Sequence, residues 1–195
     1  MKTFLAGLIV GVILVPLVVY FYFATGMAPV ATASGTMPFE TTLAHAALSA
    51  RIKKEMPKSV PVAANEQNFI AGAQTYKNNC AVCHGLPLQP QTAVSKGMFP
   101  KPPQLFQGKG VTDDEPGETY WKVDNGIRLT GMPSFANSLS PTEMWQVSLL
   151  LANADKLPDS AKQALVTTGA SAPSEPGQTP GTQPSAPPNP PANPK

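Results

Sequence analysis

The sequence is poor in cysteine, histidine and charge. Its 195 residues include only two cysteines and two histidines, and only 13% of them are charged. Cys80, Cys83 and His84 cluster within five residues, but a structural zinc site needs a fourth ligand nearby, and the one other histidine, His45, lies far upstream. The formal net charge is only +2, so we expect no nucleic-acid partner.

Both cysteines belong to one short motif. Residues 80–84 read Cys-Ala-Val-Cys-His, the pattern of a covalent attachment site for c-type haem. The two thiols can each form a thioether to one vinyl group of a single porphyrin, and the imidazole of His84 then lies under the iron. A redox dithiol or a disulfide is the alternative. A thioredoxin-like pair, however, belongs beside a strand, and the flanking residues look helical.

The residues around this motif resemble a known family. Residues 76–85, followed downstream by Gly-Met-Pro-Ser-Phe at 131–135, resemble the class I monohaem cytochromes c, most closely the domains related to the haem c subunits of haem-copper oxidases. The resemblance covers about residues 65–154. It implies an all-α fold of about four helices around one covalent haem c, whose iron is ligated by His84 and Met132.

Two further expectations follow from the same resemblance. A backbone carbonyl of the Pro102-Pro103 region should accept the second N–H of His84, which fixes the ring orientation and raises its basicity. A close crossing of two helices should involve Gly72 and Tyr76.

The number of residues that separate each methionine from His84 also bears on which one is the distal ligand, the ligand on the face of the haem opposite His84. Met132 lies 48 positions after His84, enough chain to travel around a porphyrin and return on its opposite face. Met98 is the rival, but only 14 positions of proline-rich chain separate it from His84. A methionine thioether is a soft donor, so His/Met ligation should raise the reduction potential relative to bis-histidine. We expect His45 to be an ordinary surface histidine.

A long apolar run opens the chain. Residues 4–24 are apolar almost without interruption, and 21 residues of helix span about 31 Å, enough to cross a bilayer core. Lys2 precedes the run and the next basic residue is Arg51, so the positive-inside rule places the N-terminus in the cytoplasm and the rest on the outer, periplasmic side. The sequence therefore predicts a single-pass anchor in the cytoplasmic membrane. A signal peptide cleaved after Ala33 is the alternative.

Composition divides the chain into four parts. We expect a transmembrane anchor at 1–26, a linker with a short amphipathic helix at 27–64, the haem domain at 65–157, and a disordered proline-rich tail at 158–195. The linker helix, over residues 42–55, carries Leu43, Ala47, Leu48 and Ile52 on one side. It lies on anionic lipid head groups, packs on the haem domain, or serves as a mobile spacer.

Start and stop signals predict three helices in the haem domain. One begins after Asn65 and ends near Asn79, one runs from Pro116 to a stop at Gly126, and one begins with a capping box at residues 140–143 and ends near Asn153. A core of about 90 residues is thin for independent stability. We therefore expect the apoprotein to be poorly folded.

These features predict a membrane-anchored c-type cytochrome that transfers single electrons between respiratory or other membrane redox complexes. It would not itself be an enzyme, because both axial positions of the iron would be occupied. A fixed haem c subunit of a larger oxidase or dehydrogenase is one alternative, and a haem-based gas sensor is another. The expected partners are redox proteins or complexes, and the membrane through the N-terminal helix.

Overall fold

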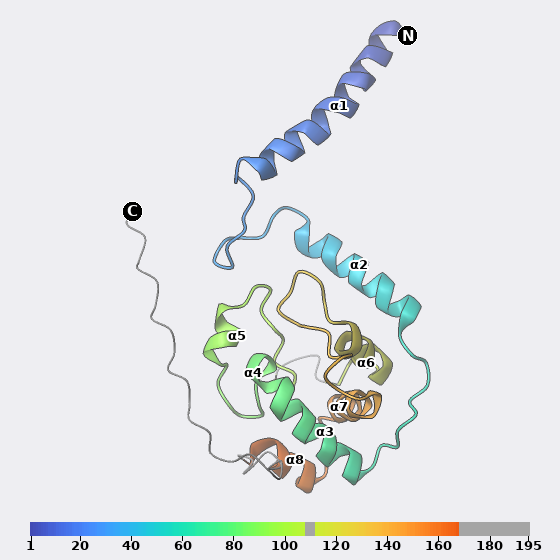
Figure 1. Ribbon diagram of the computed structural model, residues 1–195, viewed down its shortest axis with the longest axis vertical. Helices are drawn as coiled ribbons and strands as arrows, with labels where there is room; N and C mark the ends of the chain where they lie inside the picture. The colour runs from blue at the N-terminus through green and yellow to red at the C-terminus, as the bar shows by residue number, and fades with distance from the viewer. Residues whose placement is uncertain (108–111, 168–195) are drawn as a thin grey trace, which may run out of the picture.

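The protein is all-helical in the residues that the structure describes. The computed structural model describes residues 1–107 and 112–167. Within these ranges it has eight helices and no strand (Figure 1). They are α1 (Lys2–Ala24), α2 (Glu40–Glu55), α3 (Glu66–Asn79), α4 (Ala81–His84), α5 (Ala93–Gly97), α6 (Pro116–Asn125), α7 (Pro141–Ala152) and α8 (Asp159–Val166). The prediction of an all-α fold is confirmed, with three long and two short helices between residues 65 and 157.

The core forms where α3 crosses α7. Gly72 lies at the crossing, and a Cβ atom there would collide with the backbone carbonyl of Gln146. The absence of a side chain lets the two backbones approach closely. Tyr76 and Leu150 are fully buried beside it. The predicted crossing at Gly72 and Tyr76 is confirmed.

The helix boundaries follow the predicted capping signals. The side chain of Asn65 accepts a hydrogen bond from the backbone N–H of Asn68 (2.9 Å), and α3 begins there. At α7 the Ser140 hydroxyl accepts from the N–H of Glu143 (3.3 Å), and the Glu143 carboxylate accepts from the N–H of Ser140 (2.8 Å). The Ser140 hydroxyl also donates to this carboxylate (2.7 Å), and this bond, followed by that from the Ser140 N–H, holds the pKa of Glu143 below its ordinary value. Such reciprocal bonds satisfy donors that a helix start leaves unpaired.

Helix α8 corrects the expected extent of the tail. Ala161 and Leu165 of α8 are fully buried in the core. Lys77 of α3 donates hydrogen bonds to the carbonyl oxygens of Ala164 (3.0 Å) and Thr167 (2.7 Å). The expectation of disorder is therefore wrong for residues 159–166, because two buried residues on so short a helix make too weak a pattern. Residues 168–195, which include most of the expected tail, lie outside the described residues.

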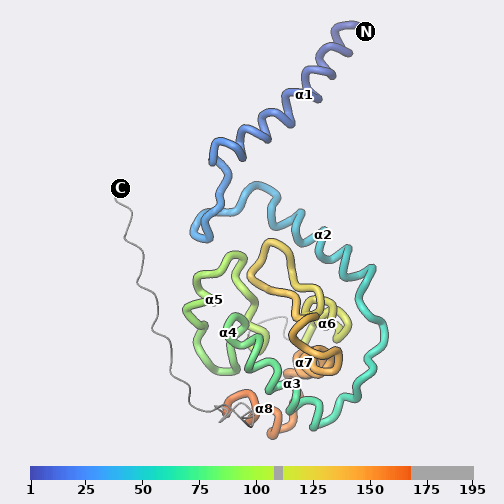
Figure 2. Tube along the Cα trace, viewed as in Figure 1, coloured from blue at the N-terminus to red at the C-terminus, as the bar shows by residue number. Residues whose placement is uncertain are grey.

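The two N-terminal helices differ in their surroundings. Helix α1 has a mean hydropathy of 2.7 with no residue of its most apolar stretch buried, and it projects away from the other helices (Figure 1). Its length and composition suit a membrane anchor and a signal sequence alike. Figure 2 shows the chain continuing through residues 25–39 into α2, which lies along the helical domain. Of the three placements considered for α2, the structure has the helix packed on this domain, against α6.

Candidate functional site

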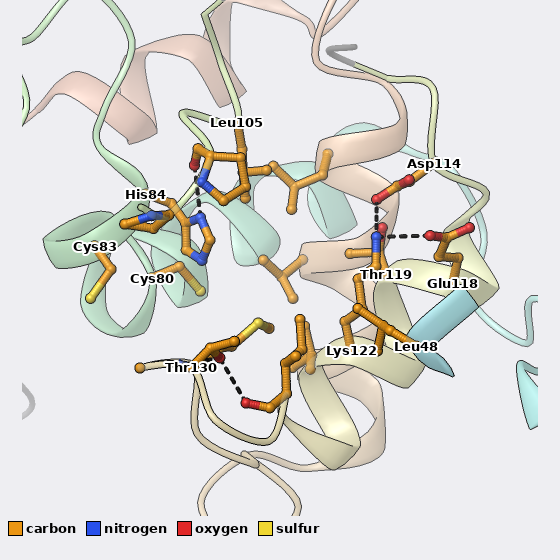
Figure 3. A pocket seen from close by; sticks show the side chains of 18 of the residues that line it. Leu48, Cys80, Cys83, His84, Leu105, Asp114, Glu118, Thr119, Lys122 and Thr130 are labelled. Carbon is orange, nitrogen blue, oxygen red and sulfur yellow. Dashed lines mark hydrogen bonds and ion pairs between the residues drawn. The ribbon is translucent and has the colours of Figure 1, made fainter. Parts of the chain in front are cut away.

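A cavity of about 450 Å³ lies beside the junction of α3 and α4 (Figure 3). This volume falls in the range of small-molecule and cofactor sites, roughly 300–1,000 Å³. All the candidate residues of the sequence line it, namely His45, Cys80, Cys83, His84, Met98 and Met132. Much of the remaining wall is apolar and comes from Ile52, Leu105, Val123, Ile127, Phe135 and Val147. The fold thus gathers the predicted site residues around one apolar space.

A single helical turn positions the two thiols and the imidazole. Cys80 ends α3 and begins α4, and its carbonyl accepts the N–H groups of Cys83 (3.1 Å) and His84 (2.9 Å). This turn places all three side chains at one end of the cavity (Figure 3). Gly85 then ends the turn with φ +73°, a left-handed conformation that glycine adopts without strain.

A backbone carbonyl fixes the tautomer of His84. Its Nδ1 lies 2.9 Å from the carbonyl oxygen of Pro103, and a carbonyl can only accept, so Nδ1 carries the hydrogen. The lone pair is therefore on Nε2. Burial lowers the pKa of His84, although the Pro103 carbonyl acts in the opposite direction. The imidazole is therefore neutral near pH 7, as metal ligation requires. The expected carbonyl of the Pro102-Pro103 region belongs to Pro103.

Further hydrogen bonds hold the turn from outside. The buried Tyr76 hydroxyl donates to the carbonyl of Gly85 (2.7 Å), and the Thr92 hydroxyl donates to the carbonyl of Val82 (2.6 Å). The Gln104 amide reaches the carbonyl of Cys83 (3.4 Å). These contacts have no signal in the sequence, because each joins residues that only the fold brings together.

Burial also sets the state of the first thiol. It raises the pKa of Cys80 to about 12, and the neighbouring Cys83 adds to this shift. Neither cysteine forms a disulfide. Cys80 is therefore a protonated thiol at neutral pH in this structure.

Both candidate methionines reach the cavity. Met132 follows a tight turn in which the N–H of Ile127 donates to the Met132 carbonyl (3.1 Å) and the Met132 N–H donates to the Thr130 hydroxyl (3.1 Å). The methyl group of Met98 lies against Gly131, where a Cβ atom would collide with it. Met98 thus lies beside the residue that precedes Met132, and each methionine is half-buried.

A charged cluster occupies the other end of the cavity. Lys122 of α6 places its Nζ 2.6 Å from Asp114 and 2.8 Å from Glu118, across the cavity from the cysteines (Figure 3). Burial alone would lower the pKa of Lys122, but the two carboxylates outweigh it and the pKa is raised. The sequence analysis missed this cluster, whose only signal was a basic residue amid acidic ones.

The helical fold and this site together define a cytochrome c domain, with a Cys-x-x-Cys-His turn, an oriented imidazole and facing methionines around one apolar cavity. Residues 67–149 match the family described as cytochrome c oxidase, cbb3-type, subunit III. The resemblance to class I cytochromes c is confirmed for this segment. The segment is therefore of the haem-binding, electron-transfer class.

Two individual proteins are also similar. The quinohemoprotein alcohol dehydrogenase ADH IIB of Pseudomonas putida is 33% identical over 89 residues, which are 46% of this chain and 11% of the dehydrogenase. The chain thus corresponds to a small part of that relative. A chain of the reducing HAO-like protein complex of Kuenenia stuttgartiensis is 25% identical, with a TM-score of 0.43 over 49% of this chain and 47% of that one.

Proposed function

We propose that the protein carries single electrons through one haem c attached covalently to Cys80 and Cys83, with His84 and Met132 as its axial ligands. One observation supports this proposal above the others. Both thiols, the imidazole and the methionine line the same cavity, and the thiols and imidazole come from one turn.

Each residue then has a distinct task. The haem supplies the one-electron iron couple when it is bound. Cys80 and Cys83 tether the cofactor, while His84, oriented by the Pro103 carbonyl, presents Nε2 as the proximal ligand. Met132 closes the opposite face with a neutral thioether that favours the reduced iron. With His84 and Met132 both engaged in this way, the iron would have no position open to a substrate or a gas, which favours an electron carrier over an enzyme or a gas sensor.

The N-terminal helix fits this role as an anchor. With α1 in the cytoplasmic membrane and the haem domain on its outer side, the carrier would exchange electrons with membrane redox complexes. The names of the similar proteins, an oxidase subunit and a dehydrogenase, favour a second candidate, a fixed subunit of such a complex. Stoichiometric copurification with other chains from native membranes distinguishes the subunit from the mobile carrier.

The attachment is tested by haem retention. Wild-type protein matured in cells with haem-attachment machinery should keep its haem through denaturation and organic extraction. The Cys80→Ala/Cys83→Ala variant should lose it completely, because no other cysteine exists in the sequence. Free extraction of haem from the wild type would contradict covalent attachment.

The distal ligand is tested by comparing two single variants. Met132→Ala should lose the weak long-wavelength absorption band of ferric Met-ligated haem and should bind CO rapidly when reduced. Met98→Ala, which removes the neighbouring side chain on the same cavity, should keep the band. The opposite result would make Met98 the ligand, and CO binding by the wild type would favour a gas sensor.

A further inference from the structure

Helix α2 presents one complete face to the cavity. The cavity-lining residues of this helix are His45, Leu48, Ser49 and Ile52. Their spacing of i, i+3, i+4 and i+7 is that of a single helical stripe. The segment lies upstream of residues 67–149, the part that matches the cytochrome family. A wall of the cavity therefore comes from outside the matched domain.

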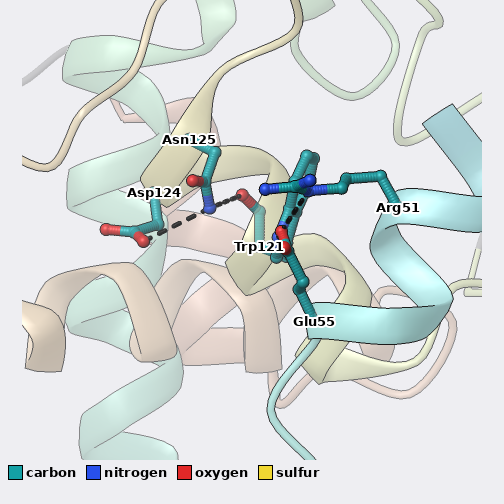
Figure 4. A network of polar contacts seen from close by, with 5 residues as sticks. All are labelled: Arg51, Glu55, Trp121, Asp124 and Asn125. Atoms are coloured by element: carbon teal, nitrogen blue, oxygen red, sulfur yellow. Dashed lines mark hydrogen bonds and ion pairs between the residues drawn. The ribbon is translucent and has the colours of Figure 1, made fainter.

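Several contacts fix α2 in this position. Ile52 is only 4% exposed, and Trp121 of α6 donates a hydrogen bond to the Glu55 carboxylate (3.3 Å) (Figure 4). Arg51 forms an ion pair with the same carboxylate (2.7 Å). These two contacts hold the pKa of Glu55 below its ordinary value, with the Arg51 contribution the larger.

The second residue after α2, Pro57, also packs closely against α6. A Cβ atom on Gly117 of α6 would collide with the carbonyl of Pro57, so the two backbones lie in close contact. Helix α2 is thus held at its C-terminal end by side chains and by backbone packing. Its stripe over the cavity is a fixed wall of the site.

The stripe lies toward the end of the cavity away from the thiols. Leu48 and Lys122 lie on the side opposite Cys80 and Cys83 (Figure 3). In haem, the vinyl groups and the two propionates occupy opposite sides of the macrocycle. A porphyrin tethered at the cysteines therefore directs its propionates toward α2 and α6.

We propose that α2 completes the cofactor site by binding the propionate side of the haem, an inference that rests on the proposed function. His45 and Ser49 hydrogen-bond the propionates, while Leu48 and Ile52 exclude water from that edge. Lys122 assists from α6, because an ammonium has three donors and Asp114 and Glu118 engage two of them.

This wall has a consequence for the reduction potential. Exclusion of water disfavours the ferric haem, which carries one more positive charge than the ferrous form, so burial raises the potential. Loss of the α2 wall should therefore lower the reduction potential.

A matched pair of leucine variants in the full-length protein tests the proposal that apolar residues of α2 exclude water from the haem. Leu48→Ser should lower the reduction potential and speed reduction by a small soluble reductant such as ascorbate. Leu43→Ser makes the same chemical change on the far side of α2, where the side chain is 68% exposed, and should do neither. Equal effects of the two variants on both quantities would overturn the inference.

A second variant tests the proposed hydrogen bonds from α2 to the propionates without opening a cavity. His45→Gln/Ser49→Ala should shift the haem-propionate bands of the resonance Raman spectrum, whereas Ala50→Ser, on the outer face, should not. Unshifted bands in the first variant would overturn propionate binding by α2. Every variant should retain covalent haem, so loss of haem from the wild type would instead contradict the proposed function.

Discussion

The two sides of the helical domain are built differently. On the side where α3 packs against α7 and α8, apolar residues such as Ala73, Leu150 and Leu165 fill the space between helices and are almost fully buried. On the other side, half-buried residues such as Leu105 and Phe135 surround a cavity of about 450 Å³. The crossing side is completed by the chain itself, whereas the cavity side is shaped to be completed by a cofactor.

The kinds of contact differ accordingly. Helix packing holds the crossing side together. The cavity side depends more on side chains that bond to the backbone of loops, such as Thr130 to Ile127 and His84 to Pro103. Loop carbonyls and N–H groups have no helical partners, so side chains must satisfy them. We infer that the crossing side contributes more to stability and the cavity side more to redox properties.

The largest expected effect comes from the crossing itself. Gly72→Ala should destabilise the domain by about 3 kcal/mol, the upper end for overpacking, because the new Cβ meets a backbone carbonyl that has no room to move. Urea unfolding followed by circular dichroism measures this change. Gly97→Ala is the control, because nothing lies within 4 Å of a Cβ atom at Gly97. Equal stabilities of the two variants would contradict the importance of the crossing.

Tyr76 joins the two sides, and its loss should have an intermediate effect. Tyr76→Phe keeps the ring, which packs edge-on against Phe106 with 5.0 Å between the ring centres. It removes the hydroxyl that donates a hydrogen bond to the Gly85 carbonyl. A buried carbonyl without its partner costs about 1–3 kcal/mol. Both the unfolding free energy and the haem spectrum should change. Tyr120→Phe, in a less buried ring stacked on Trp145, should change the stability less.

Much of this architecture could be predicted from local sequence signals. Asn65 and residues 140–143 mark helix starts through capping chemistry that acts within four residues. The thiols and the imidazole of residues 80–84 are set by one turn of helix. Such features depend on neighbours in the chain, and the structure has them where the sequence placed them.

Features that depend on distant residues could not be predicted. The face of α2 was expected at Leu43, Ala47, Leu48 and Ile52, but the structure turns His45 and Ser49 toward the cavity in place of Leu43 and Ala47. In a helix rich in alanine, weak hydrophobic differences do not decide the buried face, and contacts with α6 do. For the same reason His45, expected to be an ordinary surface residue, is exposed yet lines the cavity.

The smallest expected effect on stability concerns the charged cluster of the cavity side. Lys122→Gln should cost no more than about 1 kcal/mol, because its carboxylate partners are partly exposed. The pKa of Lys122 is raised above 10.5, so its contribution is complete below that pH and falls as the pH rises through the folded-state value. The difference in unfolding free energy between wild type and variant should therefore stay constant from neutral pH to about pH 9 and shrink in strong alkali. A difference that shrinks between about pH 7 and pH 9 would contradict the assignment to Lys122.

The raised pKa of the Cys80 thiol bears on when, during biogenesis, the proposed thioether bond could form. The thiolate is the reactive form of cysteine, and a pKa of about 12 leaves very little of it at neutral pH once the chain has folded. If haem is attached at Cys80 as proposed, thioether formation would be favoured while the chain is still open, so the cofactor would be joined first and the helices would close around it afterwards.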